Sequence, residues 1–503
     1  MKLILEGHNE QYAAEQSLLA LFPDERPVYG TAPEESDSSW ARISLAQEGA
    51  LCTAKTTICY GGKTAVGTAA EELTGDSYRQ EGQRRKLLGL SFFRAACGVT
   101  GKAPPWGSLT GVRPDKVAAR ALAGGRTEAE TDRLLDETYS VTPARRALAI
   151  ETARAGLRAK ASLGPKDVAV YIGIPFCPTR CAYCSFVSAS VEKTFALVPP
   201  YLGALVEEIW SGGKLLRDLG LRVRSFYMGG GTPTTLSADQ MDRLLTAFQN
   251  AFDLSFCSEY TVEAGRPDTV TREKLEVLRR HGIDRISVNP QTMEDNVLRA
   301  IGRRHTAAEI LAAMELTKAA GFAHINMDLI AGLPQDTPAG FRRSLDTVLS
   351  LTPDNITVHT LSLKKGSRLL TEGGAIPSAE EVGEMLSYAS PALRTAGYVP
   401  YYLYRQKYMS GSFENVGWCR PGTESLYNIC IMSELCSVFS MGAGGSTKMV
   451  DPESGEITRV FNLKYPKEYT ERPEKLAANQ AAFAAFYQHR KGDSHVLLSQ
   501  TDQ

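Results

Sequence analysis

Three cysteines stand at the spacing C-x3-C-x2-C in the stretch Tyr171-Ile-Gly-Ile-Pro-Phe-Cys177-Pro-Thr-Arg-Cys181-Ala-Tyr-Cys184-Ser-Phe186. Thiolates are soft ligands that hold iron–sulfur clusters, and a cubic 4Fe–4S cluster has four iron corners. Three cysteines in one tight loop can hold three corners and leave the fourth iron open to a small molecule. A structural zinc loop is the alternative, but zinc sites usually close with a fourth Cys or His, commonly as two separate C-x2-C pairs. Because the sequence has no such second pair, the spacing favours a cluster.

Strand-like and helix-like segments alternate on both sides of the cysteine loop, between residues 166 and 375. This alternation predicts an α/β fold with a parallel sheet, built as a partial (β/α)6 barrel. Polar residues at the carboxyl ends of such strands gather at one face, where barrel active sites lie. The six predicted strands are Val168–Ile174, Val223–Met228, Tyr260–Ala264, Arg285–Val288, His324–Ile330 and Ile356–Leu361.

A run of three glycines follows the second predicted strand, in Gly229-Gly-Gly-Thr-Pro-Thr234. Successive glycines let the backbone approach a ligand closely and offer exposed amides and carbonyls. A flexible turn is the alternative for such a run taken alone.

The segments that flank the barrel predict two further domains. Residues 1–165 read as an N-terminal α+β domain of unknown role, with a strand at Lys2–Glu6, another at Leu51–Tyr60 and a helical pattern from Glu71 to Ala96. Residues 376–503 read as a C-terminal extension, mostly α+β, that covers the substrate.

Length and composition fit a soluble globular protein of more than one domain. The chain has 503 residues, 43% of them hydrophobic and 22% charged, with a formal net charge of -1. It contains no long basic block, so we expect no nucleic-acid partner. The segment Met1–Gly7 lacks the apolar core of a signal peptide, and no run of about 18 apolar residues predicts a membrane span. We therefore expect a cytoplasmic protein without a membrane span, and we expect it to be a monomer.

The motifs resemble those of one enzyme family. The cysteine spacing resembles the radical S-adenosylmethionine (SAM) superfamily, and the combined pattern resembles the oxygen-independent coproporphyrinogen III oxidases. Two stretches, Glu263-Ala-Gly-Arg-Pro-Asp268 and Tyr401-Tyr-Leu-Tyr-Arg-Gln-Lys407, resemble the HemZ-like branch of this family. The other matching elements are Tyr171-x-x-x-Pro-Phe-Cys, Gly-Gly-Gly-Thr-Pro-Thr234, Asn289-Pro-Gln291, Gly302-Arg303-Arg-His305 and Asn326-Met-Asp328-Leu-Ile-Ala-Gly-Leu-Pro334.

The resemblance implies two cofactors, a 4Fe–4S cluster and SAM. It implies that Cys177, Cys181 and Cys184 ligate the cluster, and it assigns no catalytic residue. The residues implied for the SAM site are Tyr171, Tyr183, Gly230, Gly231, Thr232, Glu263, Gln291, Arg303 and Asp328.

The chemistry of the implied SAM residues suits this ligand. Carboxylates such as Glu263 and Asp328 can accept hydrogen bonds from ribose hydroxyls or from an ammonium group. A guanidinium such as that of Arg303 can pair with the methionyl carboxylate. An internal ion pair between Arg303 and Asp328 is the alternative.

The implied reaction is the oxidative decarboxylation of two propionates of coproporphyrinogen III, which gives protoporphyrinogen IX in heme biosynthesis. A reductase or a flavodoxin- or ferredoxin-type protein would then supply electrons. The chain departs from the family at two places: Gly173 stands where a histidine is usual, and Phe186 stands where some oxidases have a further cysteine. A heme-binding chaperone, or another radical reaction on a tetrapyrrole, therefore remains an alternative.

The C-terminal segment contains further candidates. Tyr401, Tyr402, Tyr404 and Tyr408, with Arg405 and Lys407, combine aromatic surface with positive charge, which suits a flat tetrapyrrole with anionic propionates. A half-buried edge strand is the alternative. Lys448 follows the small-residue run Met441–Ser446 and could meet a propionate. Cys419, Cys430 and Cys436 could bind an auxiliary metal, although the spacing is wide for such a site.

Overall fold

The computed structural model divides the chain into two compact units. The first comprises Met1–Ala153 and Leu403–Glu414, and the second comprises Arg154–Tyr402 and Asn415–Gln503. The three-domain division, with boundaries near residues 165 and 375, stays a prediction. The structure describes residues 1–22, 25–34, 37–111, 113–184, 189–363, 367–372, 375–406, 411, 413–451 and 454–499.

The first unit is built on a five-stranded sheet with the order β2-β1-β3-β4-β5. β1 runs parallel to β2 and β3, whereas β3, β4 and β5 form an antiparallel meander. α1 and α2 pack on one face of this sheet, and residues such as Leu3, Ile58 and Phe92 form the core between them. The elements are β1 (Lys2–Glu6), α1 (Gln11–Leu21), β2 (Val28–Tyr29), β3 (Ser39–Glu48), β4 (Leu51–Tyr60), β5 (Lys63–Glu72) and α2 (Ser77–Thr100).

The start of α2 differs from the prediction. The helical pattern was expected from Glu71, but the helix begins at Ser77, where the side chain of Asp76 accepts a hydrogen bond from the backbone of Arg79 at 2.8 Å. An acidic N-cap of this kind satisfies one of the free amides of the first turn. Residues up to Glu72 belong to β5 instead, and Gly67 in this strand lies directly under α2.

Helices complete the first unit. They are α3 (Asp115–Ala123), α4 (Glu128–Arg133), a π-helical turn (Leu134–Thr138) and α5 (Pro143–Ala161), whose last residues enter the second unit. Glu414 fixes the segment Leu403–Glu414 to this region, because its carboxylate accepts from Trp106 Nε1 at 2.7 Å and pairs with Arg145 at 3.0 Å.

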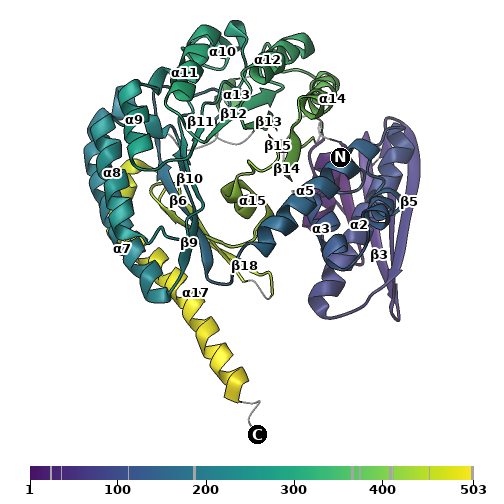
Figure 1. Cartoon of the computed structure of the whole chain (residues 1–503). Coiled ribbons are helices and arrows are strands. Elements are labelled where there is room, and N and C mark those ends of the chain that lie inside the picture. Colours follow the sequence, from purple (N-terminus) through teal and green to yellow (C-terminus); the bar gives the residue numbers. More distant parts are fainter. Residues whose placement is uncertain are drawn as a thin grey trace. The chain divides into compact units, whose positions relative to one another are not determined.

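The second unit contains the predicted partial barrel. Six parallel strands lie side by side in the order β6-β9-β10-β11-β12-β13 within an open sheet of eleven strands, so the predicted strands and the α/β class are confirmed. Figure 1 shows this sheet curved, with helices along its outer side. The strands are β6 (Asp167–Ile174), β9 (Arg222–Gly230), β10 (Glu259–Glu263), β11 (Arg285–Ser287), β12 (His324–Ala331) and β13 (Asn355–Thr360), and the outer helices are α7 (Val198–Leu219), α8 (Ala238–Ala251), α9 (Arg272–Arg280), α10 (Asp295–Ala300), α11 (Ala307–Ala319), α12 (Pro338–Ser350) and α14 (Ala379–Thr395).

Later parts of the chain extend both edges of the barrel sheet. β14 and β15 lie at one edge, next to β13, while β16 runs parallel to β6 at the other and continues into β17 and β18. One short helix, α15, lies inside the curve of the sheet (Figure 1). These elements are β14 (Val399–Tyr404), β15 (Asn415–Cys419), α15 (Leu426–Ser433), β16 (Ser437–Met441), β17 (Ser446–Val450), β18 (Ile457–Phe461), α16 (Pro466–Glu471) and α17 (Pro473–Ser499).

Two adjacent glycines, Gly212 and Gly213, lie inside α7, which continues to Leu219. A Cβ added to Gly212 would lie 2.7 Å from the ring of Phe439, and one added to Gly213 would lie 2.3 Å from the backbone oxygen of Ala251. The glycines therefore allow α7 to pack closely on β16 and α8.

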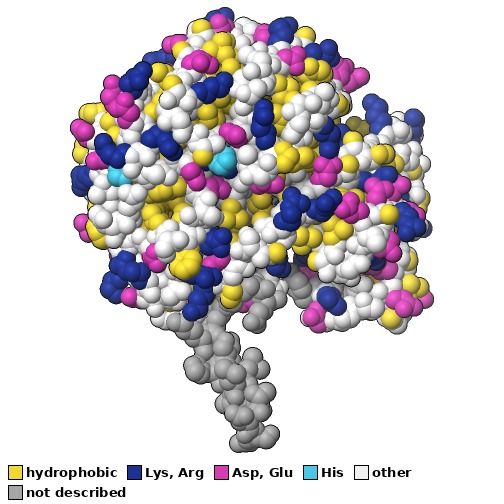
Figure 2. All heavy atoms as spheres, viewed as in Figure 1, with side chains coloured by type: hydrophobic (Ala, Val, Ile, Leu, Met, Phe, Trp, Pro, Cys, Tyr) yellow, Lys and Arg dark blue, Asp and Glu magenta, His cyan; other side chains and the backbone are white. Residues whose placement is uncertain are grey.

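The surface carries charges of both signs. Figure 2 shows basic and acidic side chains interspersed over the visible face. Within the part of the chain that the structure describes, no helix combines the length and apolarity needed to cross a membrane.

Candidate active site

The cysteine loop lies at the carboxyl ends of the parallel strands and is fixed by neighbouring segments. Cys177 lies in β7 (Phe176–Cys177), which pairs with β8 (Ala189–Ser190). The backbone of Ala182 donates to Ile301 O at 2.9 Å, and Thr179 Oγ1 donates to Gly302 O at 3.1 Å. The loop is thus attached to the chain that follows α10.

The glycine run lies against this loop. Gly231 N donates to Ile174 O at 2.8 Å, Thr232 N donates to Phe176 O at 2.7 Å, and Thr232 Oγ1 lies 3.6 Å from Cys177 Sγ. A Cβ at Gly231 would lie 2.5 Å from Phe176 O. The glycine run therefore packs closely on the backbone of the cysteine loop and brings Thr232 and Cys177 together, while its approach to a ligand stays a prediction.

Two buried arginines surround the middle cysteine. Burial opposes ionisation of the Cys181 thiol, but the neighbouring guanidinium groups of Arg303 and Arg266 hold its pKa below the ordinary range. Since the thiolate is the form that binds iron, this environment suits a cluster ligand. Among the described residues, no group of three His, Cys, Asp or Glu side chains is gathered tightly enough to hold one metal ion. A cluster does not need such a group, because each cysteine binds a different iron.

Arg303 and Asp328 have different partners, so the alternative of an ion pair between them is not what the structure shows. Arg303 donates to Asn289 O at 2.6 Å and to the Tyr183 hydroxyl at 3.3 Å. Asp328 accepts from Asn326 Nδ2 at 2.9 Å and lies 3.7 Å from His359 Nε2. Burial would raise the pKa of Asp328, but its hydrogen bonds hold this pKa below the ordinary value.

Gln291 and Glu263 lie next to Asp328. Gln291 has a positive φ of 69°, and its backbone N–H donates to Asp328 O at 2.8 Å. Glu263 accepts a hydrogen bond from the Tyr227 hydroxyl. Burial, together with the nearby charge of Asp328, raises the pKa of Glu263 to about 7. The site therefore combines one ionised carboxylate with one that ionises near neutrality.

The raised pKa of Glu263 predicts that the stability of the fold depends on pH. Because its pKa in the folded chain is about 7 and its ordinary value is 4.5, the folded state keeps a proton that the unfolded state loses between these values. Stability should therefore fall as the pH rises through this range. Glu263→Gln, which cannot ionise, should gain up to about 3 kcal/mol relative to the wild type between pH 4.5 and 8, since one pKa unit corresponds to about 1.4 kcal/mol.

Urea unfolding of both proteins across this pH range would measure the difference. Glu276→Gln, at an exposed position of α9, is the matched control and should show no such trend. A difference between Glu263→Gln and the wild type that stays constant with pH would contradict the assignment.

Three tyrosine rings from β6, β9 and α15 stack on one another. Tyr227 of β9 stacks on Tyr427 of α15 with ring centroids 4.4 Å apart. Tyr171 of β6 lies nearly parallel to both rings, at 6.3 and 6.4 Å. A Cβ at Gly230, which has a φ of 107°, would lie 3.1 Å from the Tyr171 hydroxyl. The tyrosines thus connect α15 to the glycine run and, through Tyr227, to Glu263.

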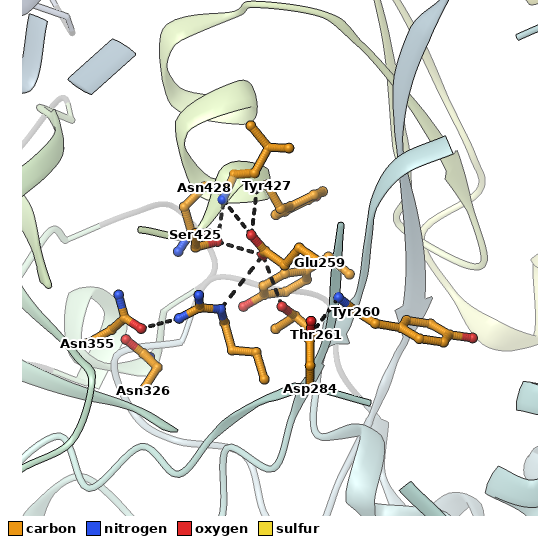
Figure 3. Close-up of polar contacts among 12 residues, drawn as sticks. Glu259, Tyr260, Thr261, Asp284, Asn326, Asn355, Ser425, Tyr427 and Asn428 are labelled. Carbon is orange, nitrogen blue, oxygen red and sulfur yellow. Dashed lines mark hydrogen bonds and ion pairs between the residues drawn. The ribbon is translucent and has the colours of Figure 1, made fainter. Parts of the chain in front are cut away.

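Glu259, at the start of β10, fixes α15 in this place. Figure 3 shows its carboxylate facing the first turn of the helix. It accepts from Ser425 Oγ at 2.7 Å, from the backbone N–H of Leu426, and from Thr261 Oγ1 at 3.0 Å. A carboxylate at a helix N-terminus satisfies free amides and interacts favourably with the helix dipole. Sequence patterns predicted neither α15 nor this anchor.

Gly173, the position where the family usually has histidine, is enclosed by backbone. A Cβ there would lie 2.9 Å from Ala443 O, and a Cβ at Gly442 would lie 2.4 Å from Gly173 O. The Tyr201 hydroxyl donates to Gly173 O at 2.6 Å and accepts from Ala443 N at 3.0 Å. The small-residue run Met441–Ser446 therefore packs directly on β6, and this close approach requires glycine on both sides.

Gly173→Ala should destabilise the protein by about 1–3 kcal/mol, because the added methyl group meets a backbone carbonyl that cannot move freely. Gly203→Ala is the control: this residue lies in α7 with open space around its Cβ position, so alanine should be neutral or stabilising by up to about 1 kcal/mol. Chemical unfolding of the two variants measures the difference, and equal stabilities would contradict the enclosure of Gly173.

Most of the C-terminal candidate residues are buried and make contacts inside the protein. Tyr401 and Tyr402 are buried, and their hydroxyls contact Asn428 and Thr357. Lys448 is also buried, where it donates to Ile431 O at 3.0 Å and lies 3.5 Å from Glu434, so its charge is already paired inside the protein. Arg405 is buried in the first unit and donates to Leu109 O. Tyr404 is partly exposed, and Phe186, Lys407 and Tyr408 lie outside the described residues.

The three C-terminal cysteines, Cys419, Cys430 and Cys436, are buried. Cys430 and Cys436 lie together in an apolar cluster with Ala169 and Val438, and Cys419 is buried in β15. Burial raises the pKa of Cys419, and mutual contact and burial raise that of Cys430, which favours neutral thiols.

Comparison with known proteins agrees with this geometry. The sequence pattern of the Radical SAM superfamily matches residues 171–348. The chain is 40% identical over 404 residues to the oxygen-independent coproporphyrinogen-III oxidase-like protein HemZ of Bacillus subtilis, covering 79% of this chain and 80% of the relative. It is 32% identical over 285 residues to the heme chaperone HemW of Lactococcus lactis, an alignment that covers 56% of this chain and 69% of the relative.

A solved structure shows the same fold. It is the coproporphyrinogen III oxidase HemN of Escherichia coli, with a TM-score of 0.51 and 23% identity over 64% of this chain and 72% of that one. Superfamily proteins of this class use a 4Fe–4S cluster and SAM. The chain belongs to the radical SAM superfamily and, within it, to the family of the oxygen-independent coproporphyrinogen III oxidase-like proteins.

Proposed function

We propose that this chain is an oxidoreductase that converts coproporphyrinogen III into protoporphyrinogen IX without oxygen. The observation that carries the proposal is the meeting of the cysteine loop and the glycine run, with the partly exposed carboxylates of Glu263 on β10 and Asp328 on β12 in the same parallel sheet. The similarity to HemZ, which extends over most of both chains, supports the choice of a porphyrinogen as substrate.

Cys177, Cys181 and Cys184 would hold the 4Fe–4S cluster. The residues that we assign to SAM are Tyr171, Tyr183, Gly230, Gly231, Thr232, Glu263, Gln291, Arg303 and Asp328. Together the bound groups would supply a carbon-centred radical that removes hydrogen from the substrate.

The protein's own contribution is binding, orientation and exclusion of water. Glu263 and Asp328 offer acceptors for an ammonium group or for hydroxyls, and Arg303 offers a donor for a carboxylate. Each of two substrate propionates would lose a hydrogen atom from its β-carbon, then carbon dioxide and one electron, leaving a vinyl group. The electron passes to an external acceptor. We further propose a reductase or a flavodoxin- or ferredoxin-type protein as electron donor, and a monomeric chain that acts in the cytoplasm.

The test is an anaerobic assay with the reconstituted protein, SAM, a reductant, an extract that accepts electrons, and coproporphyrinogen III. Mass spectrometry should detect protoporphyrinogen IX, which has lost two carboxyl groups. Cleavage of SAM without any mass loss from the porphyrinogen would argue against this activity.

A second candidate is a heme-binding chaperone, which the similarity to HemW favours. Heme binding by the purified chain, measured by visible absorbance, combined with no decarboxylation in the same preparation, would support the chaperone over the oxidoreductase.

A further inference from the structure

Arg266 is a buried positive charge at the cysteine loop that lies outside the predicted SAM site. It follows β10 and is 2% exposed. Its Nη1 group donates to Thr179 Oγ1 at 3.1 Å and lies 3.8 Å from Cys181 Sγ, within hydrogen-bonding range of a sulfur atom. Arg266 thus presents a donor to the middle one of the three cysteines.

Asp268 and its neighbours fix the direction of this donor. The carboxylate of Asp268 accepts from Arg266 Nε at 3.2 Å and from Nη2 at 3.3 Å, which is the two-pronged geometry that guanidinium and carboxylate groups favour. His305 Nδ1 lies 3.4 Å from the same carboxylate. The backbone carbonyl of Arg266 accepts from Thr269 Oγ1 at 2.7 Å. With two of its nitrogens on Asp268, the guanidinium can turn only its third nitrogen, Nη1, to the cysteine loop.

A structural ion pair alone does not require this arrangement. Arg266 and Asp268 would satisfy each other equally well if Nη1 pointed to solvent. Instead Nη1 faces the cysteine loop, where it contacts Thr179 Oγ1, the backbone oxygen of Thr179 at 3.4 Å and Cys181 Sγ. Arginine keeps its charge at every physiological pH. The arrangement therefore places a fixed positive charge and an N–H donor beside a sulfur that would bind iron.

The charge has a definite effect on electron transfer. When an iron–sulfur cluster accepts an electron, it gains one negative charge, and hydrogen bonds to its sulfurs and nearby charges set its reduction potential. A positive charge beside a ligand stabilises the reduced form. Arg303 also contacts Cys181, but the proposed role of Arg303 is to bind the SAM carboxylate, whereas the partners of Arg266 hold it at the cysteine.

We propose that Arg266 raises the reduction potential of the 4Fe–4S cluster through Cys181, and that Asp268 positions it for this role. This inference rests on the proposed cluster site. It does not depend on the identity of the substrate, because it concerns the cluster in the absence of SAM and substrate.

The experiment is a potentiometric titration of the anaerobically reconstituted protein, with electron paramagnetic resonance of the reduced cluster as the readout. Arg266→Gln should lower the one-electron equilibrium constant for reduction at least tenfold, a fall of about 59 mV in midpoint potential. The midpoint potential of Arg266→Lys should fall less, because lysine keeps the charge but cannot make the two-nitrogen contact with Asp268. Arg279→Gln is the matched control, because Arg279 of α9 donates to Ile283 O and lies against the ring of Phe322. The midpoint potential of Arg279→Gln should equal that of the wild type.

Arg266→Gln leaves the carboxylate of Asp268 without its guanidinium partner, which can destabilise the fold. The double variant Arg266→Gln/Asp268→Asn removes both charges, and its midpoint should also fall, since the lost positive charge is the one beside Cys181. Iron and sulfide analysis establishes which variants hold a full cluster. A wild-type midpoint in fully loaded Arg266→Gln, or in the fully loaded double variant, overturns the inference. A wild-type chain that assembles no cluster overturns the ligand assignment itself, whereas failure to decarboxylate coproporphyrinogen III, with shifted midpoints, overturns only the proposed function.

Discussion

Cys181→Ser is expected to abolish cluster binding and, with it, cleavage of SAM. A serine hydroxyl is a hard oxygen ligand that stays protonated near neutral pH, so it is a poor substitute for a thiolate on iron. Even outer-shell partners of metal ligands cost about 10- to 100-fold in affinity or activity when they are replaced. Loss of a direct ligand should therefore lower SAM cleavage by more than ~100-fold. Iron and sulfide content, visible absorbance and 5′-deoxyadenosine formation measure the effect.

Cys257→Ser provides the matched control. Cys257 lies near the start of β10, where its thiol donates to Glu259 O at 3.2 Å, and a serine hydroxyl can make the same hydrogen bond. This variant should keep a full cluster and wild-type SAM cleavage. A fully loaded Cys181→Ser protein would show that a different residue holds that corner of the cluster.

The sequence predicted those features that depend on local patterns. The six barrel strands alternate with helices, and this alternation of strand-like and helix-like segments is visible in a single sequence. The glycine run is likewise a local pattern, because successive glycines allow a close backbone approach that other residues do not. The cysteine spacing identified the loop for the same reason, and the structure places Thr232 of the glycine run beside Cys177.

Features that depend on contacts between distant segments were missed. β5 has a run of small residues, and it forms a strand by pairing along its length with β4, while Gly67 lets α2 pack closely on it. Arg266 was quoted as part of a motif, but its contact with Cys181 spans 85 residues and leaves no local pattern. The aromatic and basic residues around Tyr401 suited a tetrapyrrole by composition alone, whereas burial of Tyr401 and Tyr402 reflects packing that composition does not reveal.

Glu259→Ala is expected to be among the most destabilising substitutions in the second unit. Its carboxylate is the acceptor for Ser425, for the backbone of Leu426 and for Thr261, and Arg285 Nε lies 4.0 Å away (Figure 3). Alanine would leave these buried donors without an acceptor, and removal of one partner from a buried, hydrogen-bonded charge typically costs about 3–5 kcal/mol. Glu259→Gln keeps one acceptor oxygen and should cost less.

The effect should also reach the proposed SAM site. α15 begins at Leu426, so loss of its anchor frees Tyr427, which stacks on Tyr227, and Tyr227 in turn donates to Glu263. Urea unfolding and SAM-binding calorimetry of Glu259→Ala should therefore show lower stability together with weaker SAM binding. Glu276→Ala, at an exposed position of α9, should stay within about 0.5 kcal/mol of the wild type and bind SAM normally. Normal SAM binding by a folded but destabilised Glu259→Ala protein would show that α15 supports the fold without positioning Glu263.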